Sequence, residues 1–185
     1  MKRSTLIAIA ILTVSGGAFA ADLPTDPIQK ALLAAPPRLK KEEVTVIKWK
    51  PDFTYDTLQK GTSSVVCYDL SGYPGHPPIT IECTSMGNLP RVAQNLKFEA
   101  TPDKGKSELE AAEKDGSRVK PEFGSAFIHL MGADADHLRN HLTIAVPGAT
   151  AQSLGLPDKP NPAGAWLMNA GSTTAHIMLP DPPRP

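Results

Sequence analysis

Histidines are the residues of this sequence best suited to chemistry, because imidazole binds metal ions and exchanges protons near neutral pH. The chain has five: His76, His129, His137, His141 and His176. His137 and His141 are four residues apart, so on a helix both rings would share one face, a suitable geometry for zinc or copper. Asn140 and the strand-like run after it argue against such a helix, since a helix ending there would separate the two rings.

A second pattern pairs histidine with methionine. His129 and Met131 are two residues apart, as are His176 and Met178, so on strands each pair shares one face. Imidazole together with thioether suits copper. The competing interpretation is structural, because methionine commonly fills gaps in a core and a single histidine commonly makes a local hydrogen bond.

Common enzyme signatures are absent from the sequence, which has no G-x-S-x-G elbow, no P-loop, no G-x-G-x-x-G after a strand and no H-E-x-x-H. Asp134 and Asp136 could orient a histidine for acid–base catalysis, and this leaves an exported hydrolase as a third hypothesis. We prefer the simpler role of capping the turn at His137. No catalytic residue is therefore assigned.

The first twenty residues read as a secretory signal peptide. Lys2 and Arg3 precede an apolar run that is too short to span a bilayer, and Ala18-Phe19-Ala20 fits the rule for cleavage after Ala20. No later stretch approaches 18 consecutive apolar residues, so the mature product is not expected to be an integral membrane protein. We expect a periplasmic or secreted protein.

Export determines how the two cysteines are interpreted. In an oxidising compartment Cys67 and Cys83 have only each other as partners, so we predict a disulfide. On the chain-entropy model a bridge across about 15 residues stabilises by roughly 3 kcal/mol. A redox pair or two metal thiolates is less favoured, because the spacing matches neither C-x-x-C nor a zinc knuckle.

Proline governs the fold prediction. All 19 prolines follow residue 20, which excludes long uninterrupted helices. Short helices are expected at residues 28–35 and 89–98, with a helical turn within 134–140. Strands are expected at residues 44–49, 63–68, 79–84, 125–131, 142–146, 165–169 and 175–179. The predicted class is α+β, with roughly seven short strands, a C-terminal hairpin and three or four short helices.

The predicted organisation is a signal peptide (1–20), a single globular domain (21–179) and a Pro-rich tail (180–185). Within the domain, residues 101–120 are polar and read as a solvated helix and loop or a flexible segment. Charges balance, with 19 Lys+Arg against 19 Asp+Glu, which argues against a nucleic-acid partner.

Several short motifs resemble those of a family of small exported bacterial proteins of uncharacterised function. They include a Gly-Thr pair before Cys67, the second cysteine Cys83, and a C-terminal T-x-A-H-I-M-x-P motif. The matching segments are Leu33-Ala34-Ala35-Pro36, Val46-Ile47-Lys48-Trp49, Leu58-Gln59-Lys60-Gly61-Thr62, His141 to Pro147, Gly155 to Pro157 and Thr173 to Pro180.

The resemblance implies no activity, but it implies that His141 and His176 are better candidates than the other histidines. The sequence departs from the family where Thr143 replaces a methionine and where Asn169-Ala170 replaces a Trp-Lys pair. Those departures weaken the case for a shared methionine-rich metal site.

Taken together, the sequence favours a secreted or periplasmic, disulfide-stapled binding or structural module. Its ligand or protein partner is not identified, no cofactor is required, and catalysis is not expected. The alternative is a periplasmic protein that binds copper or zinc through His141 and His176, with His137 and Met178 completing the ligand shell. That alternative requires the strands of His141 and His176 to be neighbours.

Overall fold

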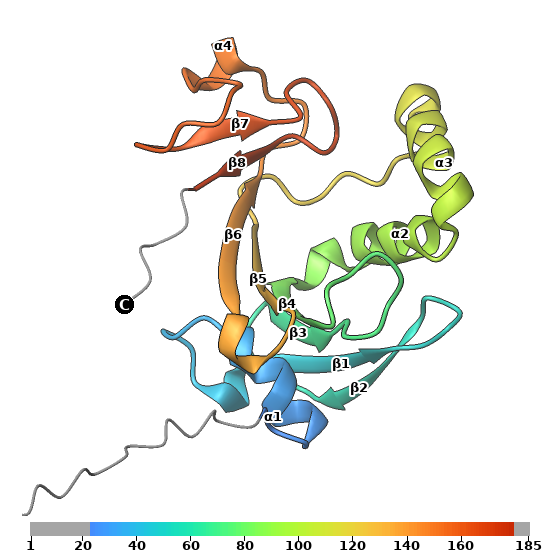
Figure 1. Ribbon diagram of the computed structural model, residues 1–185, viewed down its shortest axis with the longest axis vertical. Coiled ribbons are helices and arrows are strands. Elements are labelled where there is room, and N and C mark those ends of the chain that lie inside the picture. The colour runs from blue at the N-terminus through green and yellow to red at the C-terminus, as the bar shows by residue number, and fades with distance from the viewer. Residues whose placement is uncertain (1–22, 180–185) are drawn as a thin grey trace, which may run out of the picture.

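A computed structural model describes residues 23–179, so the predicted signal peptide and the Pro-rich tail lie outside the described residues. Eight strands form one sheet in the order β2-β1-β3-β4-β5-β6-β8-β7 (Figure 1). Neighbouring strands are antiparallel except β1 and β3, which are parallel. The strands are β1 (Thr45–Trp49), β2 (Tyr55–Gln59), β3 (Val65–Asp69), β4 (Ile79–Ser85), β5 (Ala126–Gly132), β6 (Arg139–Ala145), β7 (Trp166–Met168) and β8 (His176–Met178).

Four short α-helices accompany the sheet in the described part of the chain: α1 (Pro27–Ala31), α2 (Leu89–Glu99), α3 (Pro102–Asp115) and α4 (Ala151–Leu154). Helix α1 begins as the sequence predicts, because the Asp26 carboxylate accepts a hydrogen bond from the Gln29 amide and Pro27 occupies the first turn. The predicted α+β class is confirmed. The additional strand is β2, an edge strand whose side chains are mostly exposed and which therefore carries no apolar signal.

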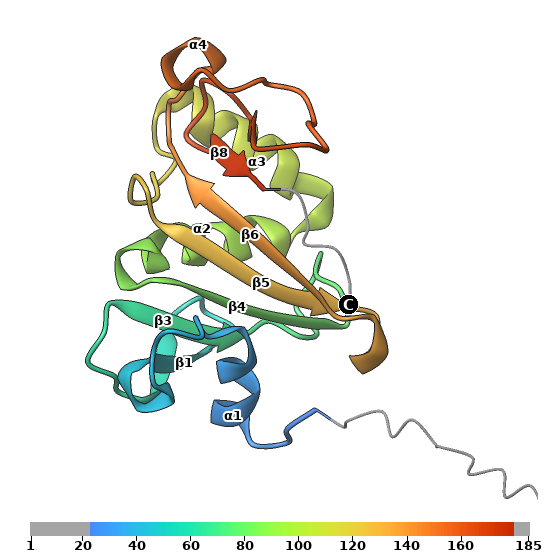
Figure 2. The same ribbon diagram turned by 90° about the vertical axis from the view of Figure 1, so that its left-hand side faces the viewer.

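The two faces of the sheet bury different sets of side chains because successive strand residues point to opposite sides. Helices α2 and α3 lie on one side of the sheet and α1 on the other (Figure 2). On the α2 side, Trp49 and Tyr68 pack against Leu89, Val92 and Leu96. On the α1 side, Leu32 and Ala34 pack against Val46, Ile81 and the two cysteines.

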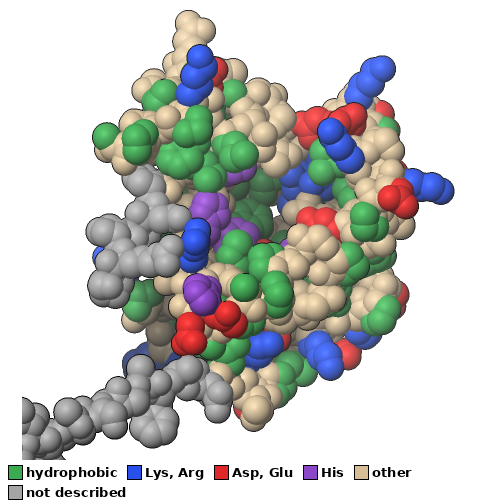
Figure 3. Space-filling view, in the orientation of Figure 1, with side chains coloured by type: hydrophobic (Ala, Val, Ile, Leu, Met, Phe, Trp, Pro, Cys, Tyr) green, Lys and Arg blue, Asp and Glu red, His purple; other side chains and the backbone are tan. Residues whose placement is uncertain are grey.

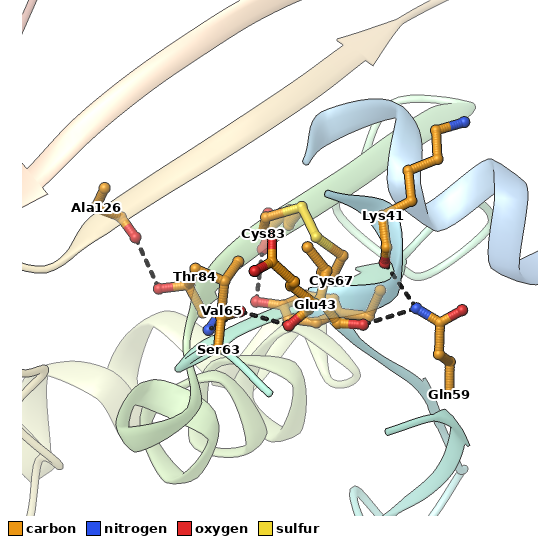
Figure 4. Close-up of a disulfide and its surroundings, with 12 residues drawn as sticks. Lys41, Glu43, Gln59, Ser63, Val65, Cys67, Cys83, Thr84 and Ala126 are labelled. Carbon is orange, nitrogen blue, oxygen red and sulfur yellow. Dashed lines mark hydrogen bonds between the residues drawn. A yellow bond between two sulfur atoms is a disulfide. The ribbon is translucent and has the colours of Figure 1, made fainter. Parts of the chain in front are cut away.

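Cys67 and Cys83 form a disulfide, as predicted. They are directly opposite each other on the antiparallel strands β3 and β4, which form a hairpin with a long loop (Figure 4). Both cysteines are fully buried. The bridge links β3 to β4 on the α1 side, which leaves the opposite face of β4 available to other residues.

The polar segment at residues 101–120 contains helix α3, which is exposed along most of its length and contacts α2. Near the C-terminus, β7 and β8 form the predicted hairpin through the turn at Gly171. Within residues 23–179, none of the helices has the length and apolar character needed to cross a bilayer.

Candidate functional site

Three of the five histidines line a single cavity on the α2 side of the sheet, which we call the histidine cavity. It has a volume of about 230 Å³ and lies between α2, strands β5, β6 and β8, and the turn before β8. Figure 3 shows a hollow in the middle of this face with histidine side chains on one wall. The lining residues are Arg91, Asn95, Pro121, Phe127, His129, His141, Thr143, Ala145, Thr174, Ala175 and His176.

His129 is fixed by a hydrogen bond to a buried carboxylate. Its Nδ1 lies 2.8 Å from Oε1 of Glu82, which is directly opposite on β4. The other oxygen of Glu82 accepts a hydrogen bond of 3.1 Å from the hydroxyl of Tyr68 on β3. Tyr68 is fully buried and Glu82 is only 9% exposed. Three adjacent strands therefore supply a continuous Tyr–Glu–His chain that ends at the cavity.

The charge state of Glu82 follows from these contacts. Burial raises the pKa of its carboxyl, but the hydrogen bonds from His129 and Tyr68 and the positive charge of His129 outweigh burial, so its pKa lies below the ordinary value. Burial and the adjacent Glu82 charge raise the pKa of Tyr68 well above its ordinary value. Glu82 is thus an anion that accepts a hydrogen bond from the neutral hydroxyl of Tyr68.

The tautomer of His129 is set by Glu82. An ionised carboxylate can only accept hydrogen bonds, so Nδ1 carries the hydrogen and the Nε2 of the neutral ring is left as an acceptor. Phe127 stacks on the ring with centroids 6.4 Å apart. His141 is directly opposite on β6, with its ring centroid 5.9 Å from that of His129 and the planes tilted by 40°.

His176 reaches the cavity from β8. Its Nδ1 donates a 2.7 Å hydrogen bond to the backbone carbonyl of Thr174, which again leaves Nε2 of the neutral ring as an acceptor. Strands β6 and β8 are neighbours, as the metal hypothesis required, but His176 is opposite Ala145. His141 is four residues earlier on β6, about 14 Å along the strand.

Arg91 provides the permanent positive charge of the cavity. It is 4% exposed, and its guanidinium donates to the Val119 carbonyl and to the hydroxyls of Thr173 and Thr174. Among residues 23–179, no carboxylate lies within ion-pair distance of it. Burial, reinforced by nearby Arg118, lowers the pKa of Arg91 to about 10, so the group remains charged at neutral pH.

The helix that would place His137 beside His141 is not present, in line with the argument from Asn140 and the strand-like run after it. His137 is in a 3₁₀ turn (Ala135–His137), is exposed, and its Nδ1 lies 2.6 Å from the Asp134 carboxylate. His141 is on strand β6, because the alternating run after Asn140 pairs with β5. Asp134 also accepts from the backbone amides of Asp136 and His137, which is the capping role expected of it.

Met178 shares the strand face of His176 but is not among the residues that line the cavity. The described part of the chain holds no group of three or more His, Cys, Asp or Glu side chains arranged to bind a metal ion. His141 and His176 thus line one cavity, separated by four residues along β6, whereas His137 and Met178 do not line it. The prediction of a copper or zinc site stays a prediction.

Three residues of this site were not singled out from the sequence. Tyr68 and Arg91 carry no motif. Glu82 does carry a signal, because it is a carboxylate at the centre of the strand Ile79-Thr80-Ile81-Glu82-Cys83, where a charged residue that faces the protein needs a partner. Its partner, His129, is 47 positions away and becomes apparent only with the register of β4 and β5.

A larger cavity of about 520 Å³ lies on the other face of the sheet. Apart from Asn140 and His141 its lining is aliphatic or proline, including Leu33, Ile128 and Leu142. It offers few groups able to orient a ligand or move a proton, so the histidine cavity is the better candidate for chemistry.

No family model, no curated protein and no solved structure matches this chain.

Proposed function

We propose that this protein is an exported, disulfide-stapled binding module that holds a small anionic ligand in the histidine cavity. The observation that carries the proposal is the charge of the lining, where Arg91 and three histidines meet and no aspartate or glutamate is present. The Glu113 carboxylate acts on the guanidinium through space and shares the Thr173 hydroxyl with it, but among residues 23–179 no carboxylate forms an ion pair with Arg91. An anionic ligand can therefore accept hydrogen bonds from its remaining N–H donors.

Arg91 is already oriented for such a role. Three of its five N–H donors are used by the Val119 carbonyl and the two threonine hydroxyls. The remaining donors can pair with an oxyanion. Thr173 is itself fixed by the Glu113 carboxylate, which accepts hydrogen bonds from the Thr173 amide and hydroxyl. The guanidinium is therefore held before a ligand arrives, which reduces the entropic cost of binding.

The size of the cavity limits the ligand. A volume of about 230 Å³ is below that of sites for drug-sized molecules, which begin near 300 Å³. A small oxyanion fits this space, either inorganic phosphate or a short carboxylate. Both present oxygens that accept from a guanidinium and from imidazole or hydroxyl groups.

Two features support export as part of the proposal. The sequence predicts a signal peptide at residues 1–20, and the protein has a buried disulfide, which persists in an oxidising compartment. Localisation of the full-length chain in fractionated cells tests this part directly.

Binding is tested by calorimetric titration of residues 21–185 with inorganic phosphate, acetate and succinate. We expect saturable binding of at least one of these anions, weakened at least 10-fold in His141→Gln. Arg91→Lys, which keeps the charge but loses the planar fork, should also weaken binding, and its folding is checked by circular dichroism. His137→Gln, a histidine outside the cavity, is the matched control. Absence of binding, or equal affinity in the His141 and His137 variants, would contradict the proposal.

Metal binding is the second candidate, and it rests on His141 and His176 lining one cavity from neighbouring strands. The Nδ1 of His176 donates to a backbone carbonyl, as is usual for histidines that ligate metals through the other nitrogen. Zinc and copper titrations of the wild type and of His141→Ala with His176→Ala distinguish the two. Stoichiometric metal that is lost in the double variant would replace the anion proposal.

A further inference from the structure

We propose that the C-terminal segment Leu179-Pro180-Asp181-Pro182 continues β8 along the outer edge of β6 and covers that edge. The inference goes beyond the proposed function and does not depend on it. It concerns the edge of a strand and the apolar cavity on the α1 side, whereas anion binding concerns the histidine cavity.

Strand β6 is longer than the strand that pairs with its outer edge. The pairing of β6 with β8 ends at Thr143 opposite Met178, and Figure 1 shows that β6 continues well beyond the end of β8. In the described part of the chain, no strand residue is paired with Asn140 or Leu142 on this side of β6. Such an edge can pair with any extended segment, and natural proteins commonly cover it.

The chain leaves β8 in the direction of this edge. Because β8 is antiparallel to β6, the residues after Met178 run toward the start of β6. Leu179 is the last described residue, and six more residues follow it in the sequence. Fully extended, those six residues span about 20 Å. The part of β6 that lies beyond β8 is only about 10 Å long, so the segment is long enough to cover it.

The hydrogen bonds of the ladder determine which residues of the segment must donate. The Val146 amide donates to the Ala175 carbonyl at 2.9 Å, and these two residues are the next pair along the observed register. In an antiparallel ladder, hydrogen-bonded and non-hydrogen-bonded pairs alternate. Extension of the register therefore makes Asp181 opposite Asn140 a hydrogen-bonded pair.

The prolines of the segment fall at positions that a ladder tolerates. Pro180 and Pro182 are at the non-hydrogen-bonded positions, where the missing N–H removes no bond to β6. Pro183 reaches a hydrogen-bonded position only after β6 has ended. Asp181 precedes a proline and is therefore restricted to extended conformations, so it loses little freedom on pairing. The alternation of proline with Asp181 thus matches this edge in phase.

The apolar cavity gives the segment a surface to pack against. Leu33, in the 3₁₀ helix after α1, and Leu142 both line this cavity, and they are 39% and 38% exposed. Exposed leucines that lie together favour packing by another segment. Leu179 lines the same cavity. As an extension of β8 it is opposite Leu142 and on the same face of the sheet, so it anchors the segment at this edge.

Exchange of backbone amides with solvent, followed by NMR in a protein of residues 21–185, tests the proposal. The Asn140 amide should exchange about 10-fold more slowly than in a chain that ends at Leu179, a factor typical of one hydrogen bond. Asp181→Pro removes the N–H at the paired position, so its Asn140 amide should exchange as fast as in the truncated chain. Asp181→Ala, the matched control, keeps that N–H and should retain slow exchange.

The outcomes separate the possible occupants of the edge. Equal exchange of the Asn140 amide in all of these proteins would overturn the proposal, as would slow exchange in Asp181→Pro. Slow exchange that persists in the truncated chain and increases with protein concentration would show that a second copy of the chain covers the edge instead. The phosphate titrations of the histidine cavity are separate measurements, so failure of either proposal leaves the other intact.

Discussion

His129 and His141 are opposite each other on β5 and β6, and their ring centroids are 5.9 Å apart. The ring of His129 is hydrogen-bonded to a buried carboxylate, that of Glu82, which is opposite it on β4. The register of three neighbouring strands therefore brings Glu82, His129 and His141 side by side, and the two imidazoles line one cavity.

The first prediction concerns Glu82→Gln, which removes the charge and keeps the shape. Hydrogen bonds to a charged group contribute about 1.5–3 kcal/mol, so we expect the free energy of unfolding at pH 7 to fall by about that amount. Equilibrium urea unfolding measures it. Glu108→Gln, an exposed carboxylate on α3, is the control and should leave stability unchanged.

The same variant has a defined pH dependence. Burial raises the pKa of Glu82, but its hydrogen bonds to His129 and Tyr68 hold the pKa below the ordinary 4.5. Its contribution to stability is therefore present above pH 4.5 and is lost as the pH falls through the lower pKa of the folded state. The difference between the wild type and Glu82→Gln should shrink at acidic pH. A difference that grows on acidification would contradict this assignment.

The second prediction concerns the disulfide. Cys67→Ser with Cys83→Ser should lower the free energy of unfolding by roughly 2–5 kcal/mol, because the bridge restricts the unfolded chain and is fully buried in the folded one. Thermal unfolding in oxidising and reducing buffer measures this. The wild type should lose stability on reduction, whereas the double variant should be indifferent to reductant. Unchanged unfolding of the reduced wild type would show that the bridge is not structural.

The third prediction concerns His76, outside the histidine cavity. Its Nε2 lies 3.0 Å from the Glu99 carboxylate, and this hydrogen bond raises the pKa of His76 against the opposing effect of burial. The stabilisation of the folded state by this hydrogen bond is present in full at a pH below 6.5, the ordinary pKa of histidine. It is lost as the pH rises through the higher pKa that His76 has in the folded state. Because the Glu99 side chain is 40% exposed, solvent limits the effect to about 1 kcal/mol or less.

Thermal unfolding of His76→Gln at pH 5.5 and 8.5 tests this. At pH 5.5 the unfolding temperature of the variant should be lower than that of the wild type, by about 2–4 °C for each kcal/mol lost. At pH 8.5 the two unfolding temperatures should be equal. His137→Gln serves as the control, since its pair with Asp134 is more than half exposed on both sides. A deficit in His76→Gln that is larger at pH 8.5 than at pH 5.5 would contradict the prediction.

Much of the fold could be predicted from the sequence because local signals are strong. Proline at the first turn defines α1 and α2, and the two strands that carry the cysteines are short apolar runs bounded by turns. Strand β2 could not be predicted, because an exposed edge strand buries almost none of its side chains and so has no apolar pattern.

The candidate site could be predicted only in part. Reading His129 and His176 as strand residues was correct, and the resemblance pointed to His141 and His176, both of which line the cavity. The sequence does not specify register, however, and register alone places Glu82 opposite His129 and His129 opposite His141. Arg91 reaches the same cavity from α2, which follows β4 in the chain but is distant in the sequence from β5, β6 and β8, and no local pattern indicates that contact.

The most direct test of an anion site uses the histidines as reporters. A protein of residues 21–185, labelled with 15N in its histidines, is titrated with inorganic phosphate while the imidazole signals are followed by NMR. Three of the five histidines line the cavity and two, His76 and His137, lie outside it. We expect the imidazole signals of His129, His141 and His176 to shift saturably as phosphate is added. The signals of His76 and His137 should not shift. Equal shifts of all five histidines, or of none, would contradict anion binding in the histidine cavity.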